Sequence, residues 1–252
     1  MTDEQPSLRP RCDVAIVFAV ALEADAFERR AASVQTFEAD GAVVHQGEVS
    51  GRGVVWCVGG VGRERAARAA RLLIQGHHPR LVVSAGFAGG LAPTLPRGKA
   101  VQSSRSIVEQ GAEAVSLATG STHKALTILT VDRIVDGVEA KRDLFTATGA
   151  EIVDMETHAV AVEASREGLP CASVRVVSDD AGQDLPREVA RLVRPQSSLR
   201  RLGTALGAIG RRPSAALDMW RLYENAVVDG KTLAAALVDL VAAQPATNPP
   251  AT

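Results

Sequence analysis

The sequence predicts an α/β fold in a single domain. Three predominantly apolar segments, at residues 14–19, 81–85 and 172–177, are typical of strands buried on both faces of a parallel sheet. Segments with helical composition follow such runs, and no internal repeat or linker divides the chain. A chain of 252 residues, 46% hydrophobic and 23% charged, can form one domain with a large core or at most two small ones. Strands that alternate with helices favour the single α/β domain.

The elements of the first half follow in short succession. A buried strand at 14–19 leads through Glu23 into a helix that ends near Arg30. Strands are predicted at 34–37, 42–48 and 54–58, with a hairpin turn at Gly51–Gly53 between the last two. A helix at 64–75 completes this half.

The second half begins with the strand at 81–85 and a loop at 86–91 whose glycines let backbone approach a ligand. Later elements are predicted in this order: strands at 100–108 and 126–131, a helix at 137–148, an apolar lead-in at 152–153, a helix at 157–167, a strand at 172–177, and helices at 199–209, 214–228 and 233–242. We expect a disordered arm at 1–12, a folded domain at 13–243 with a helical extension from about 190, and a disordered tail at 244–252.

Composition excludes several functional classes. A formal net charge of -1 gives no indication of nucleic-acid binding. Three distant cysteines, without a Cys-x-x-Cys motif, predict reduced thiols in a cytoplasmic protein, and neither cysteine nor histidine has metal-ligand spacing. The longest apolar run, Val14–Leu22, is too short to span a bilayer.

Carboxylates stand where apolar segments end. Asp154 and Glu156 follow one such segment, and Asp179 and Asp180 follow another. Ligands of open α/β sheets bind beyond the carboxyl ends of strands, and paired carboxylates there suit acid and base catalysis on a glycosidic bond. The alternative, at about even odds, is that Asp154 caps a helix and Asp179 begins a turn.

A glycine cluster at 59–62 precedes the helix at 64–75. A dinucleotide fingerprint is rejected because its sixth position would be Arg65 and no well-placed acidic residue follows. Glycines before a helix still expose N–H groups that suit an anion or a ribosyl oxygen. Gly62 and Arg63 are therefore candidate phosphate or anion ligands, although a solvated surface role for Arg63 is about twice as probable.

Four segments together resemble the superfamily of purine nucleoside phosphorylases and methylthioadenosine/S-adenosylhomocysteine nucleosidases. They are the first strand with Glu23 behind it, Gly60–Arg63, the stretch from Ser84 to Leu95, and Val153–Glu156 with Arg175–Asp179 downstream. The resemblance covers about residues 13–190 and is nearest to the nucleosidase branch. It implies one three-layer domain with a central mixed, mostly parallel sheet flanked by helices.

The resemblance also implies roles for individual residues. Glu23 matches the base that activates water, and Asp179 matches the acid that protonates N7 of the purine, with Ser178 beside it. Met155 and Glu156 match the pair that holds the ribose. Ala88 and Gly89 match the loop that lines the ribosyl face. No metal and no organic cofactor is implied, and the expected partners are a nucleoside and further copies of the chain, first of all a homodimer.

Departures from the nucleosidase pattern leave a second activity open. The segment from Lys99 to Leu126 is short and free of aromatics, and an Arg/Ala-rich tail follows residue 190. Both features resemble the hopanoid-associated phosphorylases, which release adenine from adenosylhopane. Hydrolysis of a 5′-substituted adenine nucleoside is the leading prediction. A phosphorylase with phosphate as co-substrate is the alternative, and a nucleoside-binding module without turnover is a third, at about one in ten.

The short middle segment also bears on the 5′ group of the substrate. If this short segment leaves one side of the substrate pocket uncovered, that side either stays open or is covered by a neighbouring subunit. We therefore expect an apolar 5′ substituent larger than methylthio, or completion of the pocket by a neighbouring subunit. Phe87 would add an apolar floor. The tail from Leu199 to Ala242 either joins that wall or a dimer contact, or simply packs on the sheet, at about equal odds.

Overall fold

The computed structural model describes residues 12–109, 113–120, 126–184 and 214–245, with side chains omitted from 214 to 223. The predicted arm apart from residue 12, the helix predicted at 199–209 and most of the predicted tail lie outside these ranges. No helix in the described ranges is both long enough and apolar enough to cross a membrane.

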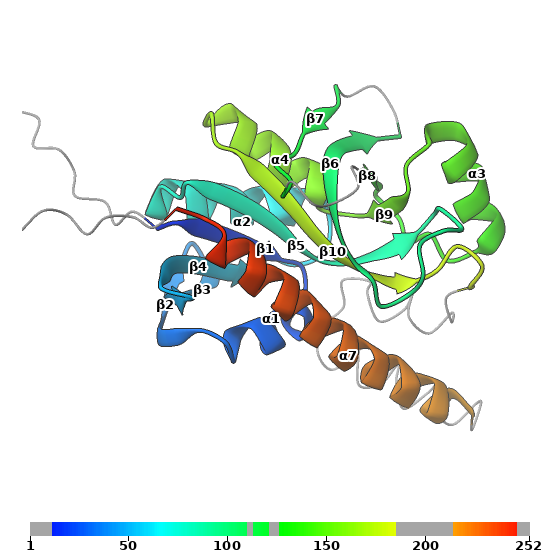
Figure 1. Ribbon diagram of the computed structural model, residues 1–252, viewed down its shortest axis with the longest axis horizontal. Helices are drawn as coiled ribbons and strands as arrows, with labels where there is room; N and C mark the ends of the chain where they lie inside the picture. The colour runs from blue at the N-terminus through cyan, green and yellow to red at the C-terminus, as the bar shows by residue number, and fades with distance from the viewer. Residues whose placement is uncertain (1–11, 110–112, 121–125, 185–213, 246–252) are drawn as a thin grey trace, which may run out of the picture.

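A single mixed sheet organises the molecule (Figure 1). Its strands are β1 (Val14–Phe18), β2 (Ala32–Ala39), β3 (Ala42–Val49), β4 (Arg52–Val58), β5 (Leu81–Gly90), β6 (Ala100–Val108), β7 (Val115–Ser116), β8 (Leu126–Thr130), β9 (Ile152–Asp154) and β10 (Cys171–Asp179). Five pairings of these strands are parallel and five are antiparallel. The sheet is mixed as predicted, but the prediction that it is mostly parallel is wrong.

Part of the sheet closes on itself. Strand β10 pairs in parallel with β5 and antiparallel with β6, while β6, β8, β9 and β5 follow one another along the same path. Five strands therefore form a barrel-like ring, and β1, β4, β3 and β2 extend from it as an open sheet. The closure was not predicted from the sequence, which indicated only a central sheet flanked by helices.

Helices cover both faces of the sheet because buried side chains alternate along the strands. On β1, Val14, Ile16 and Phe18 face helices α1 (Ala21–Glu28) and α7 (Ser214–Ala242). Ala15 and Val17 belong to the core under α2 (Arg63–His77) and α4 (Thr157–Arg166). Helix α3 (Val138–Thr148) packs through Leu144 on a smaller cluster beside β8 and β9.

Two elements differ from expectation because of glycine. The predicted glycine loop at 86–91 is mostly strand, since β5 continues to Gly90 and pairs with β9 and β10. Helix α7 is continuous where two helices were predicted. Gly230 lies inside it, and a Cβ there would stand 3.2 Å from the carbonyl oxygen of Leu22, so the glycine permits close packing on α1.

Of the two alternatives for the tail, packing on the sheet is confirmed for the C-terminal half of α7. Leu233, Leu237 and Val241 are fully buried in the core that β1, β5 and β10 share. The ring of Phe87 packs against this same core.

Candidate active site

The candidate residues lie along the C-terminal part of β5, residues 86–90. Glu23 follows β1, the neighbour of β5, while Asp179 ends β10, its neighbour on the other side. Strand β9 runs antiparallel to this part of β5, with Val153 opposite Gly89, and so brings Asp154 and Glu156 alongside. The strand ends therefore meet as the sequence analysis expected, but an antiparallel strand supplies one of them.

Glu23 is buried and held by backbone N–H groups. Its Oε2 accepts hydrogen bonds from the N–H groups of Ala19 and Val20, at 2.9 and 3.0 Å, and its Oε1 accepts one from Phe87 at 2.9 Å. A Cβ on residue 86 would lie 2.5 Å from Oε1, so only Gly86 allows this approach. Burial raises the pKa of Glu23, while the N–H of Phe87 and the charge of Arg175 lower it.

Asp154 belongs to a buried ion pair with Arg175, which is 2% exposed. The guanidinium Nη2 lies 2.7 Å from Asp154 Oδ2, 2.7 Å from Ser84 Oγ and 2.8 Å from Thr157 Oγ1. Asp154 Oδ2 also accepts the N–H of Thr157 at the start of α4, although the N-cap residue of this helix is Glu156 and not Asp154. Its carboxylate is thus engaged in holding the site together.

Arg175 begins the motif Arg175–Asp179, but no role was predicted for it from the sequence. An available signal was a charged residue in the middle of an otherwise apolar strand. Such a charge needs a buried partner of opposite sign.

Glu156 reaches across to the glycine cluster before α2. Its Oε1 accepts the N–H of Gly62 at 2.8 Å, and its Oε2 accepts that of Met155 at 3.3 Å. Burial, followed by the charge of Asp154, raises its pKa to about 7, while Arg175 lowers it. The charge of Glu23 also raises this pKa.

Asp179 is buried between a hydroxyl and an ammonium group. Ser178 Oγ donates to its Oδ1 at 2.6 Å, and Nζ of Lys141 lies 2.6 Å from its Oδ2. Lys141 is completely buried, and Nζ also donates to the carbonyl oxygens of Asp180 and Gln183 at 2.8 and 2.7 Å. The carboxylate of the adjacent Asp180 accepts the N–H of Gly182.

Lys141 was missed by the sequence analysis, although its spacing carried a signal. It stands three residues after Val138 and three before Leu144, and Leu144 is the other buried residue of α3. A lysine at that helical spacing is on the inward-facing stripe.

The two residues predicted to line the ribosyl face lie on β5 itself. Ala88 is buried, and its carbonyl oxygen accepts a hydrogen bond from Ser178 Oγ at 3.3 Å. A Cβ on residue 89 would lie 3.3 Å from Asp179 Oδ2 and 3.1 Å from a methyl group of Val153, so Gly89 keeps this wall open.

The candidate anion ligands already have protein partners. The N–H of Gly62 binds Glu156, and the guanidinium of Arg63 forms a two-point ion pair with Asp132, with Nε 2.6 Å from Oδ1. Both candidate anion ligands therefore contact carboxylates of the chain itself.

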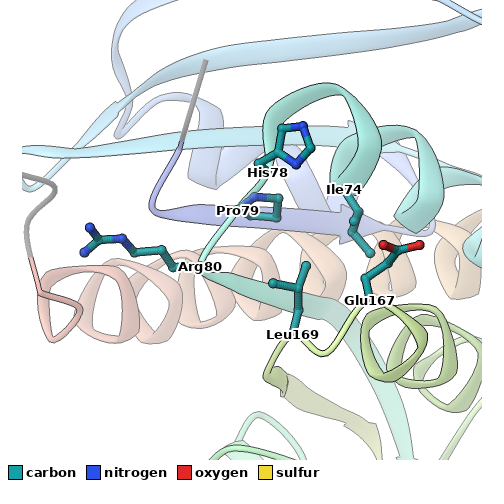
Figure 2. A pocket seen from close by; sticks show the side chains of 6 residues that line it. All are labelled: Ile74, His78, Pro79, Arg80, Glu167 and Leu169. Atoms are coloured by element: carbon teal, nitrogen blue, oxygen red, sulfur yellow. The ribbon is translucent and has the colours of Figure 1, made fainter. Parts of the chain in front are cut away.

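A separate hollow lies near the amino ends of β5 and β10, and Figure 2 shows the side chains that line it. It is lined by Ile74, His78, Pro79, Arg80, Glu167 and Leu169. These residues belong to the segments that lead into the amino ends of β5 and β10. The hollow is thus remote from the carboxylates at the other ends of these strands.

Known proteins share this architecture. The family model of the phosphorylase superfamily matches residues 13–114 and 105–209. A 5′-methylthioadenosine/S-adenosylhomocysteine nucleosidase of Actinobacillus succinogenes is 30% identical over 167 residues, which are 55% of this chain and 73% of the relative.

Solved structures agree in fold at lower identity. An S-adenosylhomocysteine nucleosidase from Streptococcus pyogenes superimposes with a TM-score of 0.71 at 17% identity, covering 93% of this chain and 98% of the other. A futalosine hydrolase of Helicobacter pylori gives a TM-score of 0.66 at 17% identity, covering 91% and 98%. The match of the family model across the site and the sheet is the decisive finding. The chain belongs to the phosphorylase superfamily.

Proposed function

We propose that this protein hydrolyses the N-glycosidic bond of a 5′-substituted adenine nucleoside. One observation carries the proposal: Gly86 and Gly89, two glycines of β5, let the carboxyl groups of Glu23 and Asp179 approach the same strand. Two carboxyl groups at one site can divide the work of glycosidic hydrolysis, one activating water and the other protonating the leaving group.

Asp179 is the proposed general acid. In the structure Ser178 Oγ and the ammonium of Lys141 each face one of its carboxylate oxygens, so Asp179 first takes up a proton from solvent as the nucleoside binds. This proton passes to N7 of adenine as the C1′–N9 bond breaks, so the base leaves as a neutral molecule. The carboxylate that remains keeps the hydrogen bond from Ser178 and the ammonium of Lys141, both at 2.6 Å. The cation stabilises the negative charge that develops during proton transfer, which favours the transfer.

Glu156 and Glu23 serve the sugar and the water. Glu156 accepts hydrogen bonds from the ribose hydroxyls, with Met155, Ala88 and Gly89 lining the sugar. Glu23 takes a proton from water, whose oxygen then bonds to C1′. Its carboxylate also stabilises the oxocarbenium-like sugar. Burial raises the pKa of Glu23 and so makes the carboxylate a stronger base.

The geometry favours water over phosphate as the nucleophile. A phosphate would need N–H donors and a cation near C1′. The N–H groups of Ala19, Val20 and Phe87 are bound to Glu23, and the guanidinium of Arg63 is bound to Asp132. A phosphate dianion would also meet the negative charges of Glu23 and Glu156. We therefore propose hydrolysis without metal or organic cofactor.

A substrate screen with and without phosphate tests this proposal. Methylthioadenosine, S-adenosylhomocysteine, adenosine, inosine and futalosine are incubated with the enzyme after chelation of metals, and the products are separated by chromatography. We expect adenine and a free 5-substituted ribose at a rate that phosphate does not change. A ribose 1-phosphate product, or activity restored by one divalent metal, would contradict the proposal.

A further inference from the structure

A β-bulge aims the proposed acid into the site. Strands β5 and β10 pair in register up to Val177 opposite Ala88, but the next pair is Asp179 opposite Gly89. Ser178 is the extra residue. A bulge of this kind redirects the side chain that follows it and leaves a backbone group outside the ladder. The position of Asp179 therefore depends on what holds the Ser178 peptide.

Arg97 holds that peptide from the loop between β5 and β6. Its Nε donates a 2.8 Å hydrogen bond to the carbonyl oxygen of Ser178. The backbone on its C-terminal side runs along the same bulge, because the N–H of Gly98 donates to the carbonyl of Val177 at 2.7 Å and the N–H of Val177 donates to the carbonyl of Lys99 at 3.0 Å. Three consecutive residues thus contact the segment that carries the acid.

Asp229 on α7 holds the other end of Arg97. Its Oδ2 accepts a 2.6 Å charge-assisted hydrogen bond from Nη2 of Arg97. Asp229 is 2% exposed, and its Oδ1 has no hydrogen-bond partner among the described residues. A carboxylate buried this deeply is unfavourable unless a cation offsets it. Burial raises the pKa of Asp229, and the charge of Arg97 opposes that rise.

We propose that Arg97 and Asp229 are positioning residues for the acid: together they connect helix α7 to the bulge at Ser178 and so set the direction of Asp179. The inference rests on the proposed function, since it concerns the same acid. Neither residue touches the substrate. Their effect reaches the reaction only through the Ser178–Asp179 peptide.

The test compares two leaving groups in Arg97→Met. Adenine needs protonation at N7, whereas 4-nitrophenolate departs as a stable anion and needs little help from an acid. With 5′-methylthioadenosine, we expect kcat to fall at least about tenfold and KM to change less than about twofold, because small misplacements of a catalytic group cost this much or more. With the 4-nitrophenyl riboside that carries the same 5′ group, turnover should stay near the wild-type value.

Asp229→Asn provides a second variant that keeps the shape of the side chain and removes its charge. It should show the same selective loss, and the double variant should be no slower than Arg97→Met, because both changes break one connection. The matched control is Arg166→Met. Arg166 also lies 2.6 Å from a buried carboxylate, that of Glu163, but on α4 away from the acid. Both substrates should be cleaved normally by it. Thermal unfolding of each variant confirms that it is folded.

Three results would overturn the inference: an equal loss on both substrates, no loss on either, or additive losses in the double variant. A wild-type protein that cleaves the nitrophenyl riboside but never releases adenine would refute the proposed function and, with it, the acid role on which the inference depends. Wild-type adenine release with variants that fail the leaving-group test would refute the inference alone.

Discussion

At the scale of single residues, the two glutamates are expected to separate in their kinetics. Glu156→Gln should raise KM and lower kcat, because the carboxylate holds ribose hydroxyls in both the ground state and the transition state. Glu23→Gln should lower kcat with little change in KM, since it acts on water alone. Steady-state kinetics with 5′-methylthioadenosine measures both. The opposite pattern would mean that the two roles are exchanged.

The pKa of Glu156 predicts a pH dependence of stability. Burial raises this pKa from 4.5 to about 7 in the folded protein. Below pH 4.5 the group is protonated in both states. As the pH rises from 4.5 to 7 the unfolded chain ionises first, so the free energy of unfolding should fall. Urea titrations of Glu156→Gln should lack this part of the fall, while Glu64→Gln, an exposed control, should retain it. Identical pH profiles for wild type and Glu156→Gln would contradict the assignment.

Lys141 gives a prediction that depends on coupling with the acid. Lys141→Met retains much of the side-chain volume but removes the cation that stabilises the Asp179 carboxylate after proton transfer. We expect kcat for adenine release to fall by about 10²-fold, at the low end of the contribution of general acids. In Asp179→Asn the same change should cost little, because the acid is already absent. Equal losses in both backgrounds would show that Lys141 acts independently of Asp179.

At the scale of elements, local pattern was sufficient for most helices and strands. Predominantly apolar segments predicted β1 and β10, and the helical segments became α2, α3 and α4 with small shifts at their ends. Predictions failed where tertiary contacts override local chemistry. Glycines at 86–90 suggested a loop, but neighbours on both sides keep them in β5. The two-residue strand β7 was not predicted, because two residues are too few to show the alternation of apolar and polar side chains that indicates a strand.

The candidate site, like the fold, could be predicted from the sequence only in part. Glu23, Glu156, Ser178 and Asp179 follow strand ends in a motif order that the sequence displays, and the structure brings all four to β5 and its neighbours. Their buried counter-ions were not predictable in the same way. Lys141, Arg175 and the pair of Arg97 with Asp229 meet their partners only through the closure of the ring and the docking of α7. Those contacts depend on strand register, which no local pattern encodes.

At the scale of the whole molecule, the 5′ group of the substrate remains a prediction. The segment between β6 and β8 is short, and Phe87 packs toward the core that α7 covers. An open apolar wall would favour longer 5′ groups, by about 0.8 kcal/mol for each CH₂ buried. We therefore expect kcat/KM to rise along a series of 5′-alkylthio adenosines, or the pocket to be completed by a second subunit. A sharp optimum at methylthio, in a protein that sedimentation shows to be monomeric, would contradict both versions.

Adenine release by Asp179→Asn, measured beside wild type, tests the central claim most directly. The asparagine keeps the shape of the side chain but has no acidic proton to give to N7. With 5′-methylthioadenosine as substrate and chromatography as the assay, we predict that release falls by about 10²- to 10⁴-fold while the fold, followed by circular dichroism, is unchanged. Release at a near wild-type rate by a folded Asp179→Asn protein would remove Asp179 from the mechanism and contradict the account.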